Sequence, residues 1–115
     1  MDAGGVVNLE GMSGGFAVES ILDGVALRIL SATSGRPRTV RDLSVELNLP
    51  LASLYRKVHE LQSAGALVAH PTRDAATGKS TRLYVSAIAS LRVEFGPSPR
   101  VEVLFTASPP LPNTK

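Results

Sequence analysis

The stretch LASLYRKVHELQSAGALVAH, residues 51–70, places Tyr55, Arg56, Lys57 and His59 between apolar residues that recur at helical spacing. At about 100° per residue, the guanidinium of Arg56 falls on the side of the helix opposite the apolar stripe. Arg makes bidentate contacts with guanine, and the major groove of DNA admits one helix. Tyr55 and Lys57 fall on the two flanks, where phosphate contacts are expected. The pattern predicts a helix that contacts nucleic acid, and the alternative is an ordinary solvated helix face, the simpler interpretation for His59.

Five further residues are candidates for DNA contact. The small side chain of Ala52 lets the helix backbone approach the bases, and Ser53 can bond to a base or to phosphate. Thr39 begins the preceding helix, whose free N–H groups and dipole favour phosphate. Arg73 and Lys79 lie in the polar turn of a predicted hairpin and could follow the DNA backbone. The alternative for this turn is a charged tip that keeps a strand edge soluble.

Three helices are expected to position these residues. An apolar stripe predicts a first helix from Ala17 to the stop signal SGRPR at residues 34–38. Thr39 predicts the N-cap of a short second helix, with Asp42 as the partner of a capping box. The break LNLP ends that helix, and a third helix follows over residues 50–64, with Gly65 as its C-terminal stop.

Two hairpins are expected after the helices. The apolar segment AGALVAH and the segment TRLYVSA predict two strands joined by the polar turn PTRDAATGKS. LRVEF and VEVLF alternate strictly around the turn GPSPR, so they predict a second hairpin with Leu91, Val93 and Phe95 on one face. The order helix, helix, helix, hairpin predicts an α+β fold of the winged helix-turn-helix type, with an additional C-terminal β-hairpin.

Four segments follow from this pattern. Residues 1–16, rich in glycine, are expected to form a flexible N-terminal arm, and residues 17–90 the winged helix-turn-helix domain. The C-terminal hairpin, residues 91–105, is a possible dimerisation element, because a lone two-stranded hairpin is marginally stable. Residues 106–115 contain three prolines and are expected to form a disordered tail.

The sequence RTVRDLSVELNLPLASLYRKVHELQSAGALVAH resembles the winged-helix transcriptional regulators of the ArsR-like superfamily. The matching positions are Leu43, Leu47, Ser53, Leu54, Arg56, Val58, Leu61, Ala64 and Gly65. The resemblance implies a sequence-specific regulator that binds double-stranded DNA, with recognition helix 50–64 in the major groove and wing 70–82 on the backbone or in the minor groove. The chain has no cysteine, which excludes the thiolate metal site of the metal-sensing members.

The composition excludes several other classes. No apolar run approaches the ~18 residues of a membrane span, and the N-terminus does not have the pattern of a signal peptide, so we expect a cytoplasmic protein without a membrane partner. Neither histidine has a carboxylate at ligand spacing, and no phosphate-binding loop is present. We therefore expect no catalytic residue, no metal site and no cofactor.

Basic charge is concentrated in the centre of the chain. Residues 36–82 contain eight Lys or Arg side chains against four Asp or Glu, which favours an anionic partner. Winged-helix proteins usually bind DNA as symmetric dimers, so we expect a homodimer formed through the first helix or the second hairpin. The main alternative is a winged helix used as a protein-interaction module within a larger complex. RNA binding is weaker, because only Tyr55 and Tyr84 are available to stack on bases.

Overall fold

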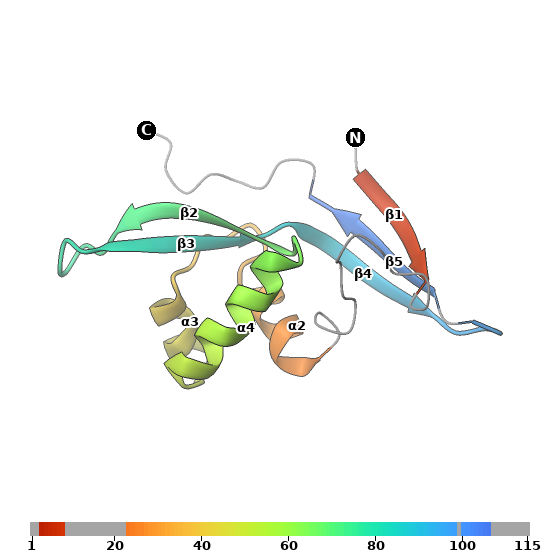
Figure 1. The fold of residues 1–115 in the computed structure, drawn as a ribbon, viewed down its shortest axis with the longest axis horizontal. Coiled ribbons are helices and arrows are strands. Elements are labelled where there is room, and N and C mark those ends of the chain that lie inside the picture. The colour runs from red at the N-terminus through yellow and green to blue at the C-terminus, as the bar shows by residue number, and fades with distance from the viewer. Residues whose placement is uncertain (1–2, 9–22, 99, 107–115) are drawn as a thin grey trace.

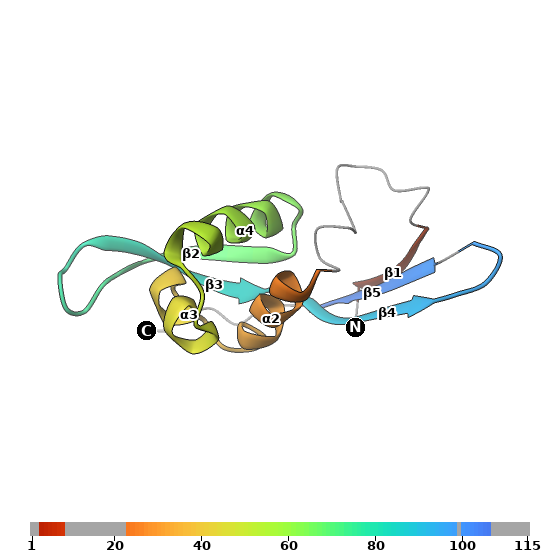
Figure 2. The same cartoon turned by 90° about the horizontal axis from the view of Figure 1, so that it is seen from below.

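The computed structural model describes residues 3–8, 23–98 and 100–106. The elements in chain order are β1 (Ala3–Asn8), α2 (Gly24–Ala32), α3 (Val40–Leu47), α4 (Leu51–Ser63), β2 (Leu67–Arg73), β3 (Ser80–Ser86), β4 (Ile88–Glu94) and β5 (Arg100–Phe105). They form two antiparallel sheets, β2-β3 and β1-β5-β4. The helices lie against one side of the β2–β3 hairpin, and the three-stranded sheet extends away from them (Figures 1 and 2). The described residues thus confirm an α+β fold with three helices and two antiparallel hairpins.

Helix α2 begins later than the sequence predicts. Asp23 has an extended backbone, with φ −85° and ψ 161°, and its carboxylate accepts a hydrogen bond from the N–H of Ala26 at 2.7 Å. This is the geometry of an N-cap, in which a side-chain oxygen satisfies a free N–H group of the first turn. A helix cannot pass through Asp23, so the predicted start at Ala17 is wrong; residues 17–22 themselves lie outside the described residues.

The two helices that follow confirm their sequence signals. The Thr39 hydroxyl accepts from the N–H of Asp42 and the Asp42 carboxylate accepts from the N–H of Thr39, which completes the capping box of α3. Asn48 ends that helix in the left-handed region at φ 57°, and the peptide N–H of Leu54 bonds to the carbonyl of Pro50 as α4 begins. Gly65, at φ 86°, closes α4. The predicted span 50–64 is correct to within one residue at each end.

The β2–β3 hairpin is longer than predicted. Both strands continue into the segment expected to be a turn, and the turn itself spans only residues 74–79. Pro71 lies inside β2, opposite Arg82. The main-chain N–H and carbonyl of Tyr84 bond to Arg38, on the edge of β3 that faces away from β2. Main-chain groups two residues apart in a strand point to the same edge, so those of Arg82 also face away from β2. Pro71 therefore stands at a position where β3 needs no N–H donor, which is where a strand tolerates proline.

The second hairpin pairs as the alternation predicts, but β4 begins earlier, at Ile88. Leu91 and Val93 are half-buried opposite Val103 and Val101. Phe95 was expected on the same face, and this is wrong. It follows the last residue of β4, where the chain leaves the strand for the turn, and its side chain is 87% exposed.

A third strand joins this hairpin from the N-terminus. Residues 3–8, predicted to belong to a flexible arm, form β1 and pair with β5 from Ala3 opposite Phe105 to Asn8 opposite Arg100. The glycines in AGGVVN concealed this strand, because glycine has low β-propensity. Its backbone supplies the partners that β5 would otherwise lack on that edge. The rest of the predicted arm, and residues 107–115 of the predicted tail, lie outside the described residues.

Strands β3 and β4 follow one another with only Ala87 between them, although they belong to different sheets. The buried hydroxyl of Ser86 donates to the carbonyl of Ile88 at 2.9 Å and accepts from its N–H at 3.1 Å. The N–H of Ala87 bonds to Ala66, and the carbonyl of Ala87 accepts from Thr106. Elements from both sheets and the end of α4 are therefore tied together at this junction.

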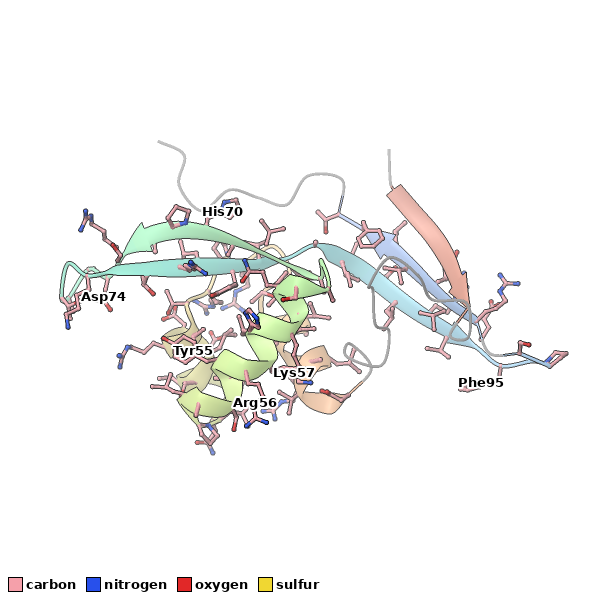
Figure 3. The ribbon with its side chains drawn as sticks, in the orientation of Figure 1. Tyr55, Arg56, Lys57, His70, Asp74 and Phe95 are labelled. Carbon is pink, nitrogen blue, oxygen red and sulfur yellow. The ribbon has the colours of Figure 1, made fainter. Side chains whose placement is uncertain are left out.

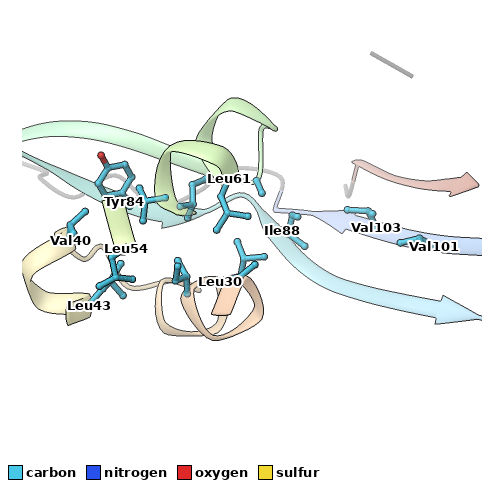
Figure 4. Close-up of a cluster of buried hydrophobic side chains, with 14 residues drawn as sticks. Leu30, Val40, Leu43, Leu54, Leu61, Tyr84, Ile88, Val101 and Val103 are labelled. Carbon is cyan, nitrogen blue, oxygen red and sulfur yellow. The ribbon is translucent and has the colours of Figure 1, made fainter. Parts of the chain in front are cut away.

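Apolar residues from the three helices and the strands form a continuous core (Figure 4). Leu43, Leu54 and Leu61 are fully buried, and Tyr84 is 6% exposed. Burial of a leucine side chain contributes about 1.5–3 kcal/mol. The seam of α4 that the sequence predicts is thus the part of the helix that fixes which residues face outward.

Candidate nucleic-acid interface

Helix α4 presents the predicted contact residues to solvent. Its seam is fixed by Leu54, Val58 and Leu61, whose exposures are 0%, 1% and 0%. Arg56 is exposed on the opposite side, and Tyr55, 58% exposed, points toward the β2–β3 hairpin (Figure 3). Ala52, in the first turn of the helix, is exposed as well.

A groove with a volume of about 420 Å³ separates α4 and the start of α3 from the turn of the β2–β3 hairpin. We call it the outer groove; Thr39, Arg41, Tyr55, Asp74 and Lys79 are among its lining residues. Three of the predicted residues, which are far apart in the sequence, are therefore brought together: Thr39, Tyr55 and Lys79. The groove can approach phosphate through two cations and a phenol, although the Asp74 carboxylate lowers its positive charge.

Arg56 belongs to a different surface. With Ser53 it lines a second groove of about 540 Å³, the α2 groove, together with Arg28 and the N-terminus of α2. Arg28 donates a hydrogen bond from its guanidinium to the carbonyl of Leu47 at 3.0 Å, so part of its donor capacity is satisfied within the protein. Arg56 forms no hydrogen bond or ion pair with any residue that the structure describes. The predicted set therefore divides between the two sides of α4.

Lys57 is placed on the predicted flank, but its ammonium is already occupied. Its Nζ lies 2.6 Å from a carboxylate oxygen of Asp23 and 2.9 Å from one of Glu60. The hydrogen bonds that Lys57 donates to these two carboxylates raise its pKa above the ordinary value for lysine. A phosphate would have to displace two charge-assisted hydrogen bonds, so this side chain is less suited to DNA contact than its neighbours.

Two other predicted residues also make intramolecular bonds. Arg73 donates from Nη1 to the carbonyl of Gly78 at 3.0 Å, which closes the hairpin turn, and it lines none of the grooves described. The hydroxyl oxygen of Thr39 accepts the capping bond from Asp42 at 3.0 Å. The Asp42 carboxylate occupies the helix N-terminus that was predicted to favour phosphate, which weakens that interpretation.

The unpartnered cations are unevenly distributed. Among the Lys and Arg side chains of the described residues, five form no hydrogen bond or ion pair: Arg41, Arg56, Lys79, Arg82 and Arg100. The first four lie around α4 and the hairpin, where they line the grooves. Arg100 lies at the start of β5, in the sheet that extends away from the helices.

Two free cations, Arg41 and Arg82, were not among the candidate contact residues, although Arg82 lies within the predicted wing, residues 70–82. Arg41 follows Val40 in the first turn of α3. Val40 is buried, so the side chain of Arg41 points to solvent. The N-cap signal at Thr39 already located this first turn in the sequence. Arg82 shares a strand face with Tyr84, because side chains two apart in a strand point the same way. The burial of Tyr84 among the helices therefore places Arg82 beside α4.

Comparison with models of protein families, with curated proteins and with solved structures found no match to this chain. Within residues 3–8, 23–98 and 100–106, no helix has the length and apolar character that crossing a membrane requires. The same part of the chain contains no group of three or more His, Cys, Asp or Glu side chains placed to hold a metal ion.

Proposed function

We propose that this chain is a winged helix-turn-helix protein that binds double-stranded DNA and regulates transcription, as its resemblance to ArsR-like regulators implies. In this proposal α4 enters the major groove, with Arg56 directed at base edges. The β2–β3 hairpin is the wing and follows the phosphate backbone or the minor groove. The order of three helices and a hairpin in the structure is compatible with this fold.

One observation carries the proposal. Of the five Lys and Arg side chains without a partner in the described residues, four surround α4 and the hairpin: Arg41, Arg56, Lys79 and Arg82. Most other cations of the fold are neutralised by Asp or Glu, such as Arg36 and Arg38 by Glu46. Cations left free around α4 and the hairpin, on both sides of the helix, are available to neutralise phosphates.

We also propose that the protein binds as a homodimer, because one recognition helix covers only part of a helical turn of DNA. The β1-β5-β4 sheet is one possible interface, since β4 forms an edge of it. Analytical ultracentrifugation at micromolar concentration tests this; a monomer, both free and on DNA, contradicts it.

The DNA proposal is tested by fluorescence anisotropy with random duplex DNA at two salt concentrations. The expected result is binding that weakens as salt rises, because phosphate neutralisation releases counterions. The double variant Arg41→Ala/Lys79→Ala removes two free cations of the outer groove. It is expected to reduce the slope of log K against log salt by about 2, on the basis of about 0.9 per phosphate.

Arg100→Ala provides a control, because it removes an exposed and unpartnered arginine from the sheet that extends away from the helices. Its binding is expected to equal that of the unaltered protein. Absence of binding, binding that salt does not weaken, or equal losses in the control and the double variant would reject the proposal. Binding of a protein partner by α4 without any DNA binding would favour the interaction module instead.

A further inference from the structure

A third groove, which we call the inner groove, lies between α4 and β3 and has a volume of about 370 Å³. It is bounded by Tyr55, His59 and Gln62 on the helix and by Ser80, Thr81 and Arg82 on the strand. Tyr55, Ser80 and Thr81 also line the outer groove, so the two grooves adjoin. The DNA proposal above counts Arg82 among the free cations, but it gives no ligand to the inner groove itself.

The charge of the inner groove distinguishes it from the other two. None of the described residues that line it is Asp or Glu, whereas Asp74 lines the outer groove and Asp23 and Glu60 line the α2 groove. Arg82 is exposed and forms no bond to any described residue, and the same is true of His59. The inner groove therefore combines a free guanidinium and a free imidazole with no opposing carboxylate.

Neutral donors complete the site. The Gln62 amide and the hydroxyl of Ser80, which shares a strand face with Arg82, can each donate a hydrogen bond. A site with this many donors suits an anion with several oxygens.

We propose that the inner groove binds a phosphate group, held by the guanidinium of Arg82 and the imidazole of His59. Arg pairs with phosphate in a bidentate geometry that combines charge and direction. The phosphate can come from the backbone of a DNA duplex or from a small phosphorylated molecule, for which a volume of about 370 Å³ is sufficient. The duplex source rests on the proposed function, and the small-molecule source does not.

The two histidines of the chain make a direct test possible. In protein labelled with ¹³C-histidine, the ring signals of His59 report on the inner groove. His70, which lies on β2 and does not line the groove, serves as an internal reference (Figure 3). The full chain is titrated separately with inorganic phosphate, with a nucleoside monophosphate and with a short duplex, and the anisotropy of the duplex is recorded in parallel.

The expected result is a saturable shift of the His59 signals with at least one of these probes, while the His70 signals stay in place. Arg82→Gln is expected to weaken that binding about tenfold, since it removes a charge-assisted hydrogen bond. Arg100→Gln, the matched control, is expected to leave it unchanged. Because Arg82 is exposed, the variant is expected to retain the fold, and the unperturbed His70 signals verify this.

Each outcome is decisive. A shift with the monophosphate or inorganic phosphate identifies a small-molecule site, and a shift with the duplex alone identifies a DNA phosphate. Duplex binding seen by anisotropy without any His59 shift overturns the phosphate site but leaves the proposed function intact. A His59 shift with free phosphate in the absence of duplex binding supports the phosphate site and overturns the proposed function. A shift that Arg82→Gln leaves unchanged also overturns the site.

Discussion

The ammonium of Lys57 lies 2.6 Å from the carboxylate of Asp23, which joins the middle of α4 to the N-cap of α2. The two residues are 34 positions apart in the sequence. The same Asp23 carboxylate group accepts the capping bond from Ala26. The Asp23 side chain thus caps α2 and also holds α4, the helix that carries Arg56. Lys57 therefore positions α4 against α2 and is not a free cation.

Substitution of Asp23 separates these two contributions. Asp23→Ala removes both the cap and the ion pair, and we expect a loss of about 1–2 kcal/mol in the free energy of unfolding. Asp23→Asn keeps a good capping oxygen and removes only the charge, so the expected loss is below about 1 kcal/mol. Urea unfolding followed by circular dichroism measures both. Equal losses would contradict the capping role.

The same ion pair predicts a dependence of stability on acid. Burial alone would raise the pKa of Asp23, but the hydrogen bond from Lys57, the bond from Ala26 and the charge of Lys57 outweigh it, and the pKa lies below 3.8. A lowered carboxyl pKa stabilises the fold above the unfolded value, and this stabilisation is lost as pH falls through the folded value.

The advantage of the unaltered protein over Asp23→Asn should therefore be constant near neutrality and shrink between about pH 5 and pH 2. Lys57 behaves in the opposite sense, because its raised pKa gives stabilisation that persists up to 10.5 and is lost above it. Thermal unfolding across the acid range tests the first statement. A difference that stays constant down to the lowest pH would show that the pair does not contribute.

Lys57 and Arg56 are adjacent but should differ in their effect on DNA binding. Arg56→Ala is expected to cost about 1–3 kcal/mol on a specific site, if the guanidinium contacts a base. Lys57→Gln should lower stability slightly and leave the salt dependence of binding nearly unchanged, since its ammonium is paired with Asp23 and Glu60. Anisotropy on one duplex compares the two variants. A larger fall in the salt slope for Lys57→Gln would assign the phosphate contact to Lys57.

The turn between α3 and α4 gives a prediction about the backbone. Asn48 has φ 57° and ψ 51°, a left-handed conformation that costs about 1–2 kcal/mol for most side chains. Asn48→Ala is expected to reduce stability by about 1 kcal/mol, whereas Asn48→Gly should change it by less than about 0.5 kcal/mol. Chemical denaturation of the two variants provides the measurement, and an equal effect of both would exclude a conformational cause.

Local signals predicted most of the helical region. The capping box at Thr39, the break at Asn48 and the stop at Gly65 each depend on residues close in sequence, and all three appear in the structure. Strand β1 depends instead on pairing with β5, almost a hundred residues later. Its sequence contains two glycines and offers no comparable local signal.

Spacing in the sequence predicted how the candidate residues are placed on α4, but it did not predict which cations have partners. Helical geometry gave the outward direction of Arg56 and the flank positions of Tyr55 and Lys57, because it depends only on spacing. Whether a cation is free depends on which distant carboxylate reaches it, and the sequence did not reveal that Asp23 would pair with Lys57. The position of Arg82 also depends on tertiary structure, because Arg82 lies beside α4 only as a result of the burial of Tyr84.

The direct passage from β3 to β4 leaves no flexible linker between the two sheets, because only Ala87 separates the strands. The main chain of Tyr84 bonds to Arg38, so β3 is held against the helical region. The Ser86 hydroxyl then bonds to Ile88 at the start of β4. The orientation of the three-stranded sheet relative to the helices is therefore set by short-range bonds on either side of one alanine.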